Sequence, residues 1–298
     1  SVNPVSFLGI TMRELSSIRF VVLVDDYAGF TEGLLGEHGF STLVELRYSD
    51  GLVKRVLFDT GATGRVLLFN ARRLGLDLGL VDYVVVSHRH WDHAGGIPGV
   101  AKVNQKATVI AHPGILEPAY SIGEQGLRYI GLTDESRRAL ERFRTLLTKS
   151  AFELAPGTWF LGEVERYYDN KYAVKGFKKL REGELVDDSV LDDTGMAIRL
   201  GSTTLVLAGC SHSGISNIVR KARKTAGGDE LVVLGGLHLA NADAETVSRV
   251  VSELENEGVE EVYAGHCTGL RGEAELLKVY GDRMRKIHSG FTITAEAD

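Results

Sequence analysis

Three imidazoles and a carboxylate lie within six consecutive positions of this chain, directly after an apolar run at residues 83–86. These candidate ligands are His88, His90, Asp92 and His93. In an extended strand end alternate side chains share a face, so the first three can converge while the fourth turns to an adjacent position. Histidine nitrogen and aspartate oxygen both bind zinc, and a catalytic zinc site keeps one position for water. A polar surface turn would not combine this spacing with a buried strand before it and a glycine pair after it. The segment therefore predicts a site for two metal ions.

The composition fits a globular chain that acts on a small molecule. The 298 residues are 44% hydrophobic and 25% charged, which suffices for one α/β domain, 1–298, with an insertion at about residues 113–193. The net charge of −6 comes from 40 acidic and 34 basic residues without a long block of one sign. We therefore expect no nucleic acid and no membrane as a partner. A homo-oligomer is compatible with this composition.

Neither targeting signals nor a disulfide framework are indicated. No stretch reaches 18 apolar residues, and residues 1–20 lack a basic start followed by an apolar core and a cleavage site. The two cysteines, Cys210 and Cys267, are too few for the disulfide scaffold of a small secreted protein. We therefore expect a cytoplasmic protein.

A strand hairpin delivers a further carboxylate. Residues 41–48 and 52–58 are strand-like, and the Ser-Asp-Gly sequence between them favours a tight turn because glycine adopts positive φ. Asp59 follows the second strand and can accept a hydrogen bond from a metal-bound imidazole, which fixes the tautomer of that imidazole. The alternative is a cap for the helix predicted over residues 63–74. Beside the histidine cluster we favour support of the metal site.

Three histidines recur at equivalent positions in the last third of the chain. Strands are predicted over residues 196–200, 203–208, 230–234 and 260–264, and helices over residues 215–224, 244–257 and from near residue 272. His212, His238 and His266 follow the last three of these strands, at the edge where open α/β sheets place their sites. Histidines scattered through a core would not recur in this way.

The segments around two of these histidines favour an anionic substrate. Ser211 and Ser213 precede one predicted helix, and Cys267 and Thr268 precede the next. Backbone N–H groups at a helix N-terminus bind anionic oxygen. We therefore expect these four residues to bind phosphate.

Residues 113–193 show the weakest pattern and are predicted to form an irregular wall or lid. A helix over residues 133–149, with a Thr-Asp-Glu start and an apolar stripe, is the exception. Aromatic and basic residues at 167–181 can offer ring faces to a heterocycle and cations to phosphates, or else form a solvated loop. We interpret His112 as a structural histidine. Other predicted elements are strands over residues 18–24, 83–86 and 108–111, a glycine-rich loop at 29–39 and a helix over 95–103.

These motifs together resemble those of the metallo-β-lactamase superfamily. The resemblance rests on His-x-His-x-Asp-His, on the upstream Phe-Asp-Thr-Gly, and on Gly-Cys-Ser-His-Ser-Gly-Ile, Gly-Gly-Leu-His-Leu and Gly-His-Cys-Thr-Gly further along. The later signatures are similar to those of the branch described as dihydropteroate-synthase-like, whose archaeal members are assigned to methanopterin biosynthesis. The resemblance implies an α/β fold, namely a four-layer αββα sandwich with two metals at one edge between the sheets.

The resemblance and the spacing together suggest roles for individual residues. We expect one metal to bind His88, His90 and His212, and the second to bind Asp92, His93 and His266. Zinc is expected, with iron or manganese as alternatives. His238 is either a ligand or an acid placed over the leaving group, and Cys210 is either a ligand or a buried thiol. The catalytic residues are then Asp92, His238 and Asp59.

Three classes of function follow from these expectations. The branch implies a transferase that condenses a dihydropterin methyl diphosphate with a ribofuranosylaminobenzene phosphate and releases pyrophosphate. A metal-dependent hydrolase of a phosphoester, a cyclic diester or a lactone-like carbonyl is the alternative. A metal-binding protein without turnover is disfavoured because the ligand set is complete.

Overall fold

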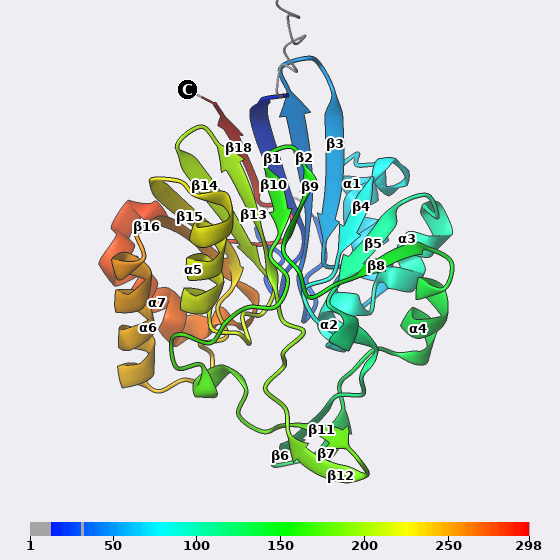
Figure 1. Cartoon of the computed structure of the whole chain (residues 1–298), viewed down its shortest axis with the longest axis vertical. Coiled ribbons are helices and arrows are strands. Elements are labelled where there is room, and N and C mark those ends of the chain that lie inside the picture. Colours follow the sequence, from blue (N-terminus) through cyan, green and yellow to red (C-terminus); the bar gives the residue numbers. More distant parts are fainter. Residues whose placement is uncertain (1–12, 31–32, 298) are drawn as a thin grey trace, which may run out of the picture.

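Two seven-stranded sheets pack face to face and carry helices on their outer surfaces (Figure 1). The structure, a computed structural model, describes residues 13–30 and 33–297. Its layers confirm the predicted αββα sandwich. The part of the N-terminal prediction that concerns residues 1–12 lies outside the described residues, as do residues 31 and 32 of the predicted glycine-rich loop.

The first sheet is built from the first half of the chain and one late strand. Its order is β18 (Thr292–Glu296), β1 (Leu15–Val24), β2 (Ser41–Tyr48), β3 (Val53–Phe58), β4 (Tyr83–Val85), β5 (Thr108–Ala111) and β8 (Arg144–Leu147). Strands β3, β4, β5 and β8 are parallel, so their carboxyl ends share one edge. The helices α1 (Gly64–Arg73), α3 (Ile97–Val103) and α4 (Asp134–Leu140) pack on this sheet, and the short α2 (Trp91–Ala94) lies at its edge (Figure 1).

The second sheet repeats this plan with later residues. Its order is β17 (Met284–Lys286), β16 (Val259–Gly265), β15 (Glu230–Gly236), β14 (Thr203–Ala208), β13 (Gly195–Leu200), β10 (Thr158–Phe160) and β9 (Phe152–Ala155). Strands β14 to β17 are parallel. The helices α5 (Ile215–Ala226), α6 (Ala244–Asn256) and α7 (Gly269–Tyr280) cover its outer face. Short 3-10 helices are Leu78–Leu80, Pro113–Leu116, Lys171–Ala173, His266–Thr268 and Gly281–Arg283.

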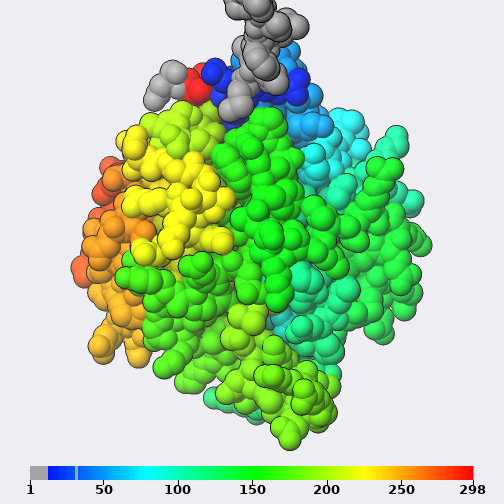
Figure 2. All heavy atoms as spheres, in the orientation of Figure 1, coloured from blue at the N-terminus to red at the C-terminus, as the bar shows by residue number. Residues whose placement is uncertain are grey.

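A third, four-stranded sheet stands apart from the sandwich. It joins β6 (Tyr120–Gly123) and β7 (Gly126–Tyr129) to β11 (Phe177–Arg181) and β12 (Glu184–Asp187) in the order β12-β11-β6-β7. In the space-filling view it projects beyond the lower edge of the body (Figure 2). Two stretches of chain that are distant in sequence therefore form one small sheet beside the strand ends.

Alternate side chains of β1 pack into two different hydrophobic cores, one on each face of the first sheet. Ile18, Phe20 and Val22 are buried in the cluster between the two sheets, whereas Val21 and Leu23 belong to the cluster under α1 and α3. Successive side chains of a strand point to opposite faces. A strand covered on both faces therefore needs an uninterrupted apolar run, and β1 has one.

Most elements predicted outside residues 113–193 are confirmed, with ends that shift by a few residues. The predicted turn between β2 and β3 is present, and its Gly51 has a φ of 86°. The helix predicted from near residue 272 begins at Gly269. The short strands β17 and β18 and the helix α2 have no counterpart in the prediction.

The helix predicted over residues 133–149 is wrong in its second half. Helix α4 ends at Leu140, and β8 follows at Arg144 and pairs in parallel with β5. Tertiary pairing overrides the helical stripe here, because β8 extends the first sheet beyond β5. Leu140 and Phe143 are buried as expected, but Leu146 is 42% exposed.

Residues 113–193 are also more regular than predicted. They supply β9 and β10 to the second sheet and all four strands of the third sheet. These strands are only three to five residues long, too short for a clear periodicity, and the links of β10 to β13 and of β6 to β11 join segments that are distant in sequence. Among the helices of the described residues, none has the length and apolar character needed to cross a membrane.

Replacing Phe160 by alanine should lower the free energy of unfolding by about 3–5 kcal/mol, because this ring is fully buried between the two sheets. Denaturant unfolding followed by circular dichroism measures the change. The matched control is Phe30→Ala, at a ring that is 93% exposed, where a change within about 0.5 kcal/mol is expected. Similar losses in both variants would contradict the assignment of the inter-sheet core.

Candidate metal centre

The candidate site lies where the carboxyl ends of the parallel strands of both sheets meet. Its residues are Asp59 after β3, His88, His90, Asp92 and His93 after β4, Cys210 and His212 after β14, His238 after β15, and His266 after β16. These ends are aligned because β3 pairs in parallel with β4, β14 with β15, and β15 with β16. Residues far apart in sequence thereby reach one place.

Four non-glycine residues of these loops have left-handed backbone conformations. Their φ values are 57° at Asp59, 61° at Ser211, 50° at His238 and 48° at His266. Such conformations cost of order 1–3 kcal/mol each and persist where the surroundings over-determine them. The fold therefore maintains strained backbone at the ends of the strands that carry the site.

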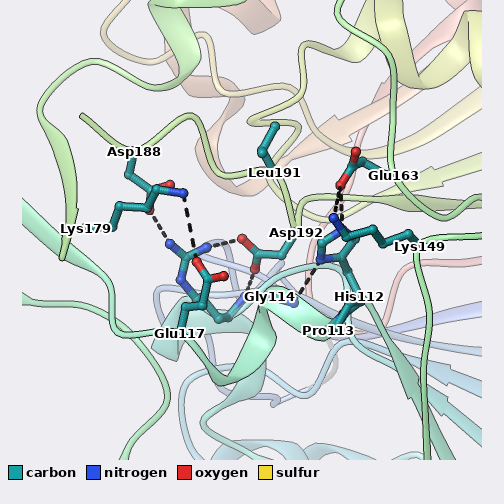
Figure 3. A pocket seen from close by; sticks show the side chains of 11 residues that line it. His112, Pro113, Gly114, Glu117, Lys149, Glu163, Lys179, Asp188, Leu191 and Asp192 are labelled. Atoms are coloured by element: carbon teal, nitrogen blue, oxygen red, sulfur yellow. Dashed lines mark hydrogen bonds and ion pairs between the residues drawn. The ribbon is translucent and has the colours of Figure 1, made fainter. Parts of the chain in front are cut away.

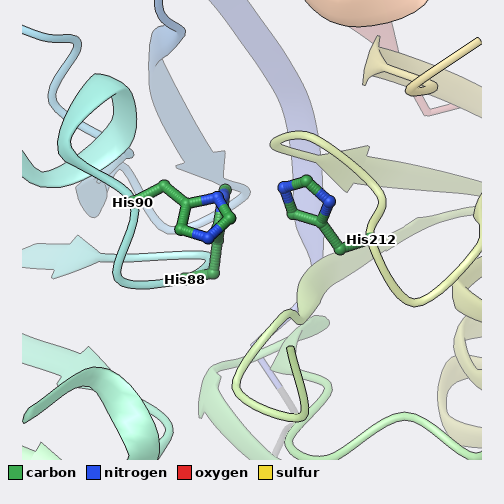
Figure 4. A group of neighbouring side chains, drawn as sticks. All are labelled: His88, His90 and His212. Carbon is green, nitrogen blue, oxygen red and sulfur yellow. The ribbon is translucent and has the colours of Figure 1, made fainter. Parts of the chain in front are cut away.

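His88, His90 and His212 form the first cluster, and their side chains point toward one another (Figure 4). Their ring centroids lie 4.6–4.8 Å apart. The Nε2 atoms of all three are buried and have no hydrogen-bond partner among the described residues. Burial lowers the pKa of His90 to about 3 and those of His88 and His212 well below the usual range. The three rings are therefore neutral, and leaving their polar atoms unsatisfied would cost about 1–3 kcal/mol each. A bound cation would satisfy all three.

Asp92, His93 and His266 form the second cluster. The Nε2 atoms of the two histidines are 3.1 Å apart, and Asp92 Oδ2 lies 3.2 Å from that of His93 and 3.4 Å from that of His266. Cys210 Sγ lies 3.7 Å from the Nε2 atom of His266. Bonds of about 2.0–2.3 Å to a tetrahedral zinc place two ligands about 3.3–3.6 Å apart. The spacings of 3.1–3.4 Å are close to this range and suit a metal held by the three predicted residues, and Cys210 is within reach as a fourth ligand.

Hydrogen bonds donated by Nδ1 orient imidazole rings in both clusters. His93 Nδ1 donates to Asp59 Oδ2 at 2.7 Å, and His212 Nδ1 donates to the carbonyl of Ala173 at 2.6 Å. Such bonds fix the tautomer that leaves Nε2 for a metal. Burial opposes protonation of His93, but the carboxylates of Asp92 and Asp59 raise its pKa to about 9. The helix cap that Asp59 was alternatively expected to form is supplied by Thr63.

Asp26 and His38 also belong to the candidate site, although no motif in the sequence pointed to them. Asp26 Oδ1 accepts from His266 Nδ1 at 2.6 Å, in the same role as Asp59 toward His93. Its other oxygen accepts from His38 Nδ1 at 2.8 Å, and His38 Nε2 lies 3.6 Å from Asp92 Oδ2. The only signal in the sequence was the acidic pair that ends the first strand. Nothing local pairs it with a histidine near the opposite end of the chain.

His238 lies between the first cluster and the two cysteines. Its ring centroid is 4.4 Å from that of His212, and its Nδ1 is 3.2 Å from Cys210 Sγ. Cys210 Sγ is in turn 3.0 Å from Cys267 Sγ. His238 is thus close enough to act either as a ligand with Cys210 and His212 or as a proton donor at the cavity.

Packing explains the two glycines that precede His238. A Cβ on Gly235 would lie 1.8 Å from the carbonyl oxygen of Ala208, and one on Gly236 would lie 2.7 Å from Cys267 Sγ. Close packing of β15 against β14 and the cysteine therefore requires glycine at both positions. Approach of a ligand to the backbone is not needed to explain them.

The hydroxyls expected to bind phosphate are engaged in the fold. Ser211 Oγ donates to the carbonyl of Gly236 and Ser213 Oγ to that of Asp193, while Thr268 Oγ1 accepts from the backbone N–H of Leu237. Of the four residues expected to bind phosphate, only Cys267 is among the described residues that line the cavity at the metal centre. The three hydroxyls hold loops together instead.

That cavity has a volume of about 210 Å³ and opens in front of both clusters. Trp91, Ile130 and Phe177 give it apolar walls, and Ser121 and Arg128 of the third sheet complete it. The Phe177 ring lies 5.0 Å from the rings of His90 and His212. Of segment 167–181, Phe177 lines this cavity and Ala173 supplies the carbonyl that orients His212, whereas Tyr167 stacks under Arg220 at 3.9 Å.

A second cavity, of about 190 Å³, surrounds the buried Arg89 of the metal-binding segment (Figure 3). The Arg89 guanidinium pairs with Asp188 and Asp192, and its backbone N–H donates to Asp192 at 2.8 Å. His112 bonds Glu163 at 2.9 Å, in agreement with a structural role. These contacts tie the loop after β4 to the chain that returns from the third sheet.

Comparisons with known proteins agree with this geometry. The family described as Metallo-beta-lactamase superfamily matches residues 36–266. A curated relative from Methanocaldococcus jannaschii, named 7,8-dihydropterin-6-methyl-4-(beta-D-ribofuranosyl)-aminobenzene-5'-phosphate synthase, is 32% identical over 93% of this chain and 96% of its own length. An uncharacterized protein of the same archaeon is 31% identical over 87% of this chain and 96% of its own length.

Solved structures lead to the same family. A crystal structure described as a metal-dependent hydrolase of the beta-lactamase superfamily is 30% identical, with a TM-score of 0.78, and the match covers 94% of this chain and 99% of that chain. A named synthase and a superfamily of metal-dependent enzymes indicate that this protein is an enzyme, and the superfamily implies divalent metal ions. The chain belongs to the metallo-β-lactamase superfamily, in the branch that includes the archaeal dihydropterin synthase.

Proposed function

We propose that the enzyme joins a dihydropterin methyl diphosphate to a ribofuranosylaminobenzene phosphate, which would form the compound after which its archaeal relative is named. The observation that carries the proposal is identity of 32% over 93% of this chain and 96% of that relative. In this reaction the bond between the methylene carbon and the diphosphate oxygen breaks. The arylamine nitrogen bonds to that carbon and loses a proton, and pyrophosphate leaves.

Two divalent metals are part of the proposal. His88, His90 and His212 would hold one, and Asp92, His93 and His266 the other, with Cys210 as a further ligand of the second; zinc, iron and manganese all suit such ligands. When bound, such ions polarise phosphoryl oxygens and lower the pKa of water. The unpartnered Nε2 atoms of the first cluster and the ligand spacings of the second support this assignment.

The remaining residues position groups or move protons. Asp59 and Asp26 hold the imidazoles of His93 and His266 so that their Nε2 atoms face the centre. His238 lies at the cavity and would donate a proton to the leaving oxygen. The walls formed by Trp91 and Phe177 suit a planar ring system.

A metal-dependent hydrolase is the second candidate. It is favoured by the structural match of TM-score 0.78 to a protein described as such a hydrolase. In that case water, rather than an arylamine, would attack the substrate, and no acceptor would be needed.

The deciding experiment supplies the metal-loaded enzyme with the dihydropterin methyl diphosphate, with and without the ribofuranosylaminobenzene phosphate. Pyrophosphate release that requires both substrates, with formation of the joined product, supports the transferase. Release without the acceptor identifies a hydrolase. No release in either mixture would refute the proposed reaction.

Elemental analysis of the purified protein should find about two transition-metal ions per chain. His90→Ala should lose at least one of them, because it removes one of three converging Nε2 atoms. His112→Ala is the matched control, since this histidine is also buried but bonds Glu163 outside the centre, and it should keep both metals. Full metal content in His90→Ala would contradict the first cluster as a metal site.

His238→Ala separates the two roles left open for this residue. As a proton donor, its loss should lower kcat by about 10²–10⁴-fold while both metals stay bound. Parallel measurement of turnover and metal content tests this. Loss of a metal would instead make His238 a ligand, and unchanged turnover with full metal would leave it without a catalytic role.

A further inference from the structure

We infer that Arg128, on the third sheet, selects substrates that carry a phosphoryl or diphosphate group by binding oxygens of that group at the mouth of the metal cavity. The inference deepens the proposed function and rests on it only for the expectation of a phosphorylated substrate. None of the motifs that identified the metal centre includes Arg128.

Strand register decides which way Arg128 faces. Within the third sheet, Arg128 pairs with Ser121, and Ser121 pairs with Phe177. Paired residues of neighbouring strands lie on the same face of a sheet. All three of these residues line the cavity at the metal centre. One face of the third sheet therefore forms a wall of the candidate active site, and Arg128 stands on it.

The opposite face is mostly apolar apart from the Lys178–Asp187 ion pair. Ile122 pairs with Leu127, and Leu180 pairs with Leu185, each being between 44% and 58% exposed. An ordinary hairpin on a protein body would turn such an apolar face inward and its cations toward solvent. Here the arginine side faces the histidine clusters, which indicates selection for charge at the cavity rather than for packing.

Arg128 is the sole arginine or lysine among the described residues that line this cavity. The hydrogen bonds and ion pairs of the described residues do not include its guanidinium, so its donors are available to a ligand. A guanidinium presents a planar fork that matches two oxygens of a phosphate. The hydroxyls of Ser211, Ser213 and Thr268, in contrast, are engaged within their loops.

The neighbours of Arg128 define the class of ligand more closely. Trp91 and Phe177 line the cavity with aromatic rings, and Ile130 adds further apolar surface. A ligand that contacts both the aromatic walls and Arg128 has a planar ring and, a short distance away, an anionic group with several oxygens. A ring that bears a phosphate or diphosphate has this combination, whereas a neutral lactone lacks the anion.

The test uses the metal-loaded full chain and inorganic pyrophosphate as the probe, with binding measured by calorimetry. Arg128→Leu should weaken pyrophosphate binding by about 10- to 100-fold, the usual contribution of hydrogen bonds between charged groups. Arg128→Lys should restore part of the affinity, because it keeps the charge but loses the fork. Metal content should stay at the wild-type level in both variants.

The matched control is Lys178→Met, which removes a cation from the opposite face of the same sheet, where Lys178 pairs with the exposed Asp187. Pyrophosphate should bind this variant as it binds the wild type. Equal binding to wild type and Arg128→Leu, or no binding to the wild type, would overturn the inference. Weakened binding in Arg128→Leu alone, in an enzyme that fails to join the two proposed substrates, would refute the proposed reaction and leave the anion site standing.

Discussion

Parallel pairing of strands within two packed sheets is the constraint on which this site depends. Each cluster draws residues from both sheets, because the carboxyl ends of β3, β4, β14, β15 and β16 meet at one edge of the sandwich. The inter-sheet core, with Phe58 and Leu207 from opposite sheets, holds those ends together. The positive φ angles at Asp59, His238 and His266 are tolerated only because this packing surrounds them. Stability and site geometry are therefore consequences of the same contacts.

The two clusters would offer unlike environments to the two proposed metals. His88, His90 and His212 are neutral ligands in a desolvated setting, so a cation there would keep most of its charge toward a substrate. The other cluster includes the Asp92 carboxylate, and the Cys210 thiol lies near it. Asp59 and Asp26 accept hydrogen bonds from its two histidines. Its negative charge would hold a cation more tightly and leave it less able to polarise a substrate. Such asymmetry suits a reaction in which one metal anchors a group and the other activates it.

Local sequence was sufficient for most elements outside residues 113–193 and for placing the histidines at one edge, because strand ends followed by unusual polar residues are visible without partners. It was not sufficient where pairing is remote. Arg144–Leu147 continues a helical stripe yet forms β8, since β5 offers a free edge. Asp26 and Arg128 joined the site through contacts with residues distant along the chain, to which no spacing points. The hydroxyls of Ser211 and Ser213, which were expected to contact phosphate, donate to backbone carbonyls in this structure, because a hydroxyl beside a helix start can also satisfy a carbonyl of a neighbouring segment.

The pairing of β18 with β1 has a consequence for synthesis of the protein. β1 is made early, but its neighbour β18 follows every other strand of both sheets in chain order. The segment before β18 is also linked to the site. Ser289 Oγ accepts a hydrogen bond from the backbone N–H of Asp25, and the Asp25 carboxylate accepts one from the backbone N–H of His266. During translation β1 thus emerges with one edge unpaired and remains so while the second sheet is being made. An open apolar edge is a template for pairing with other chains. The nascent chain must therefore keep this strand covered, by a chaperone or by transient contacts of its own, until the final strand arrives.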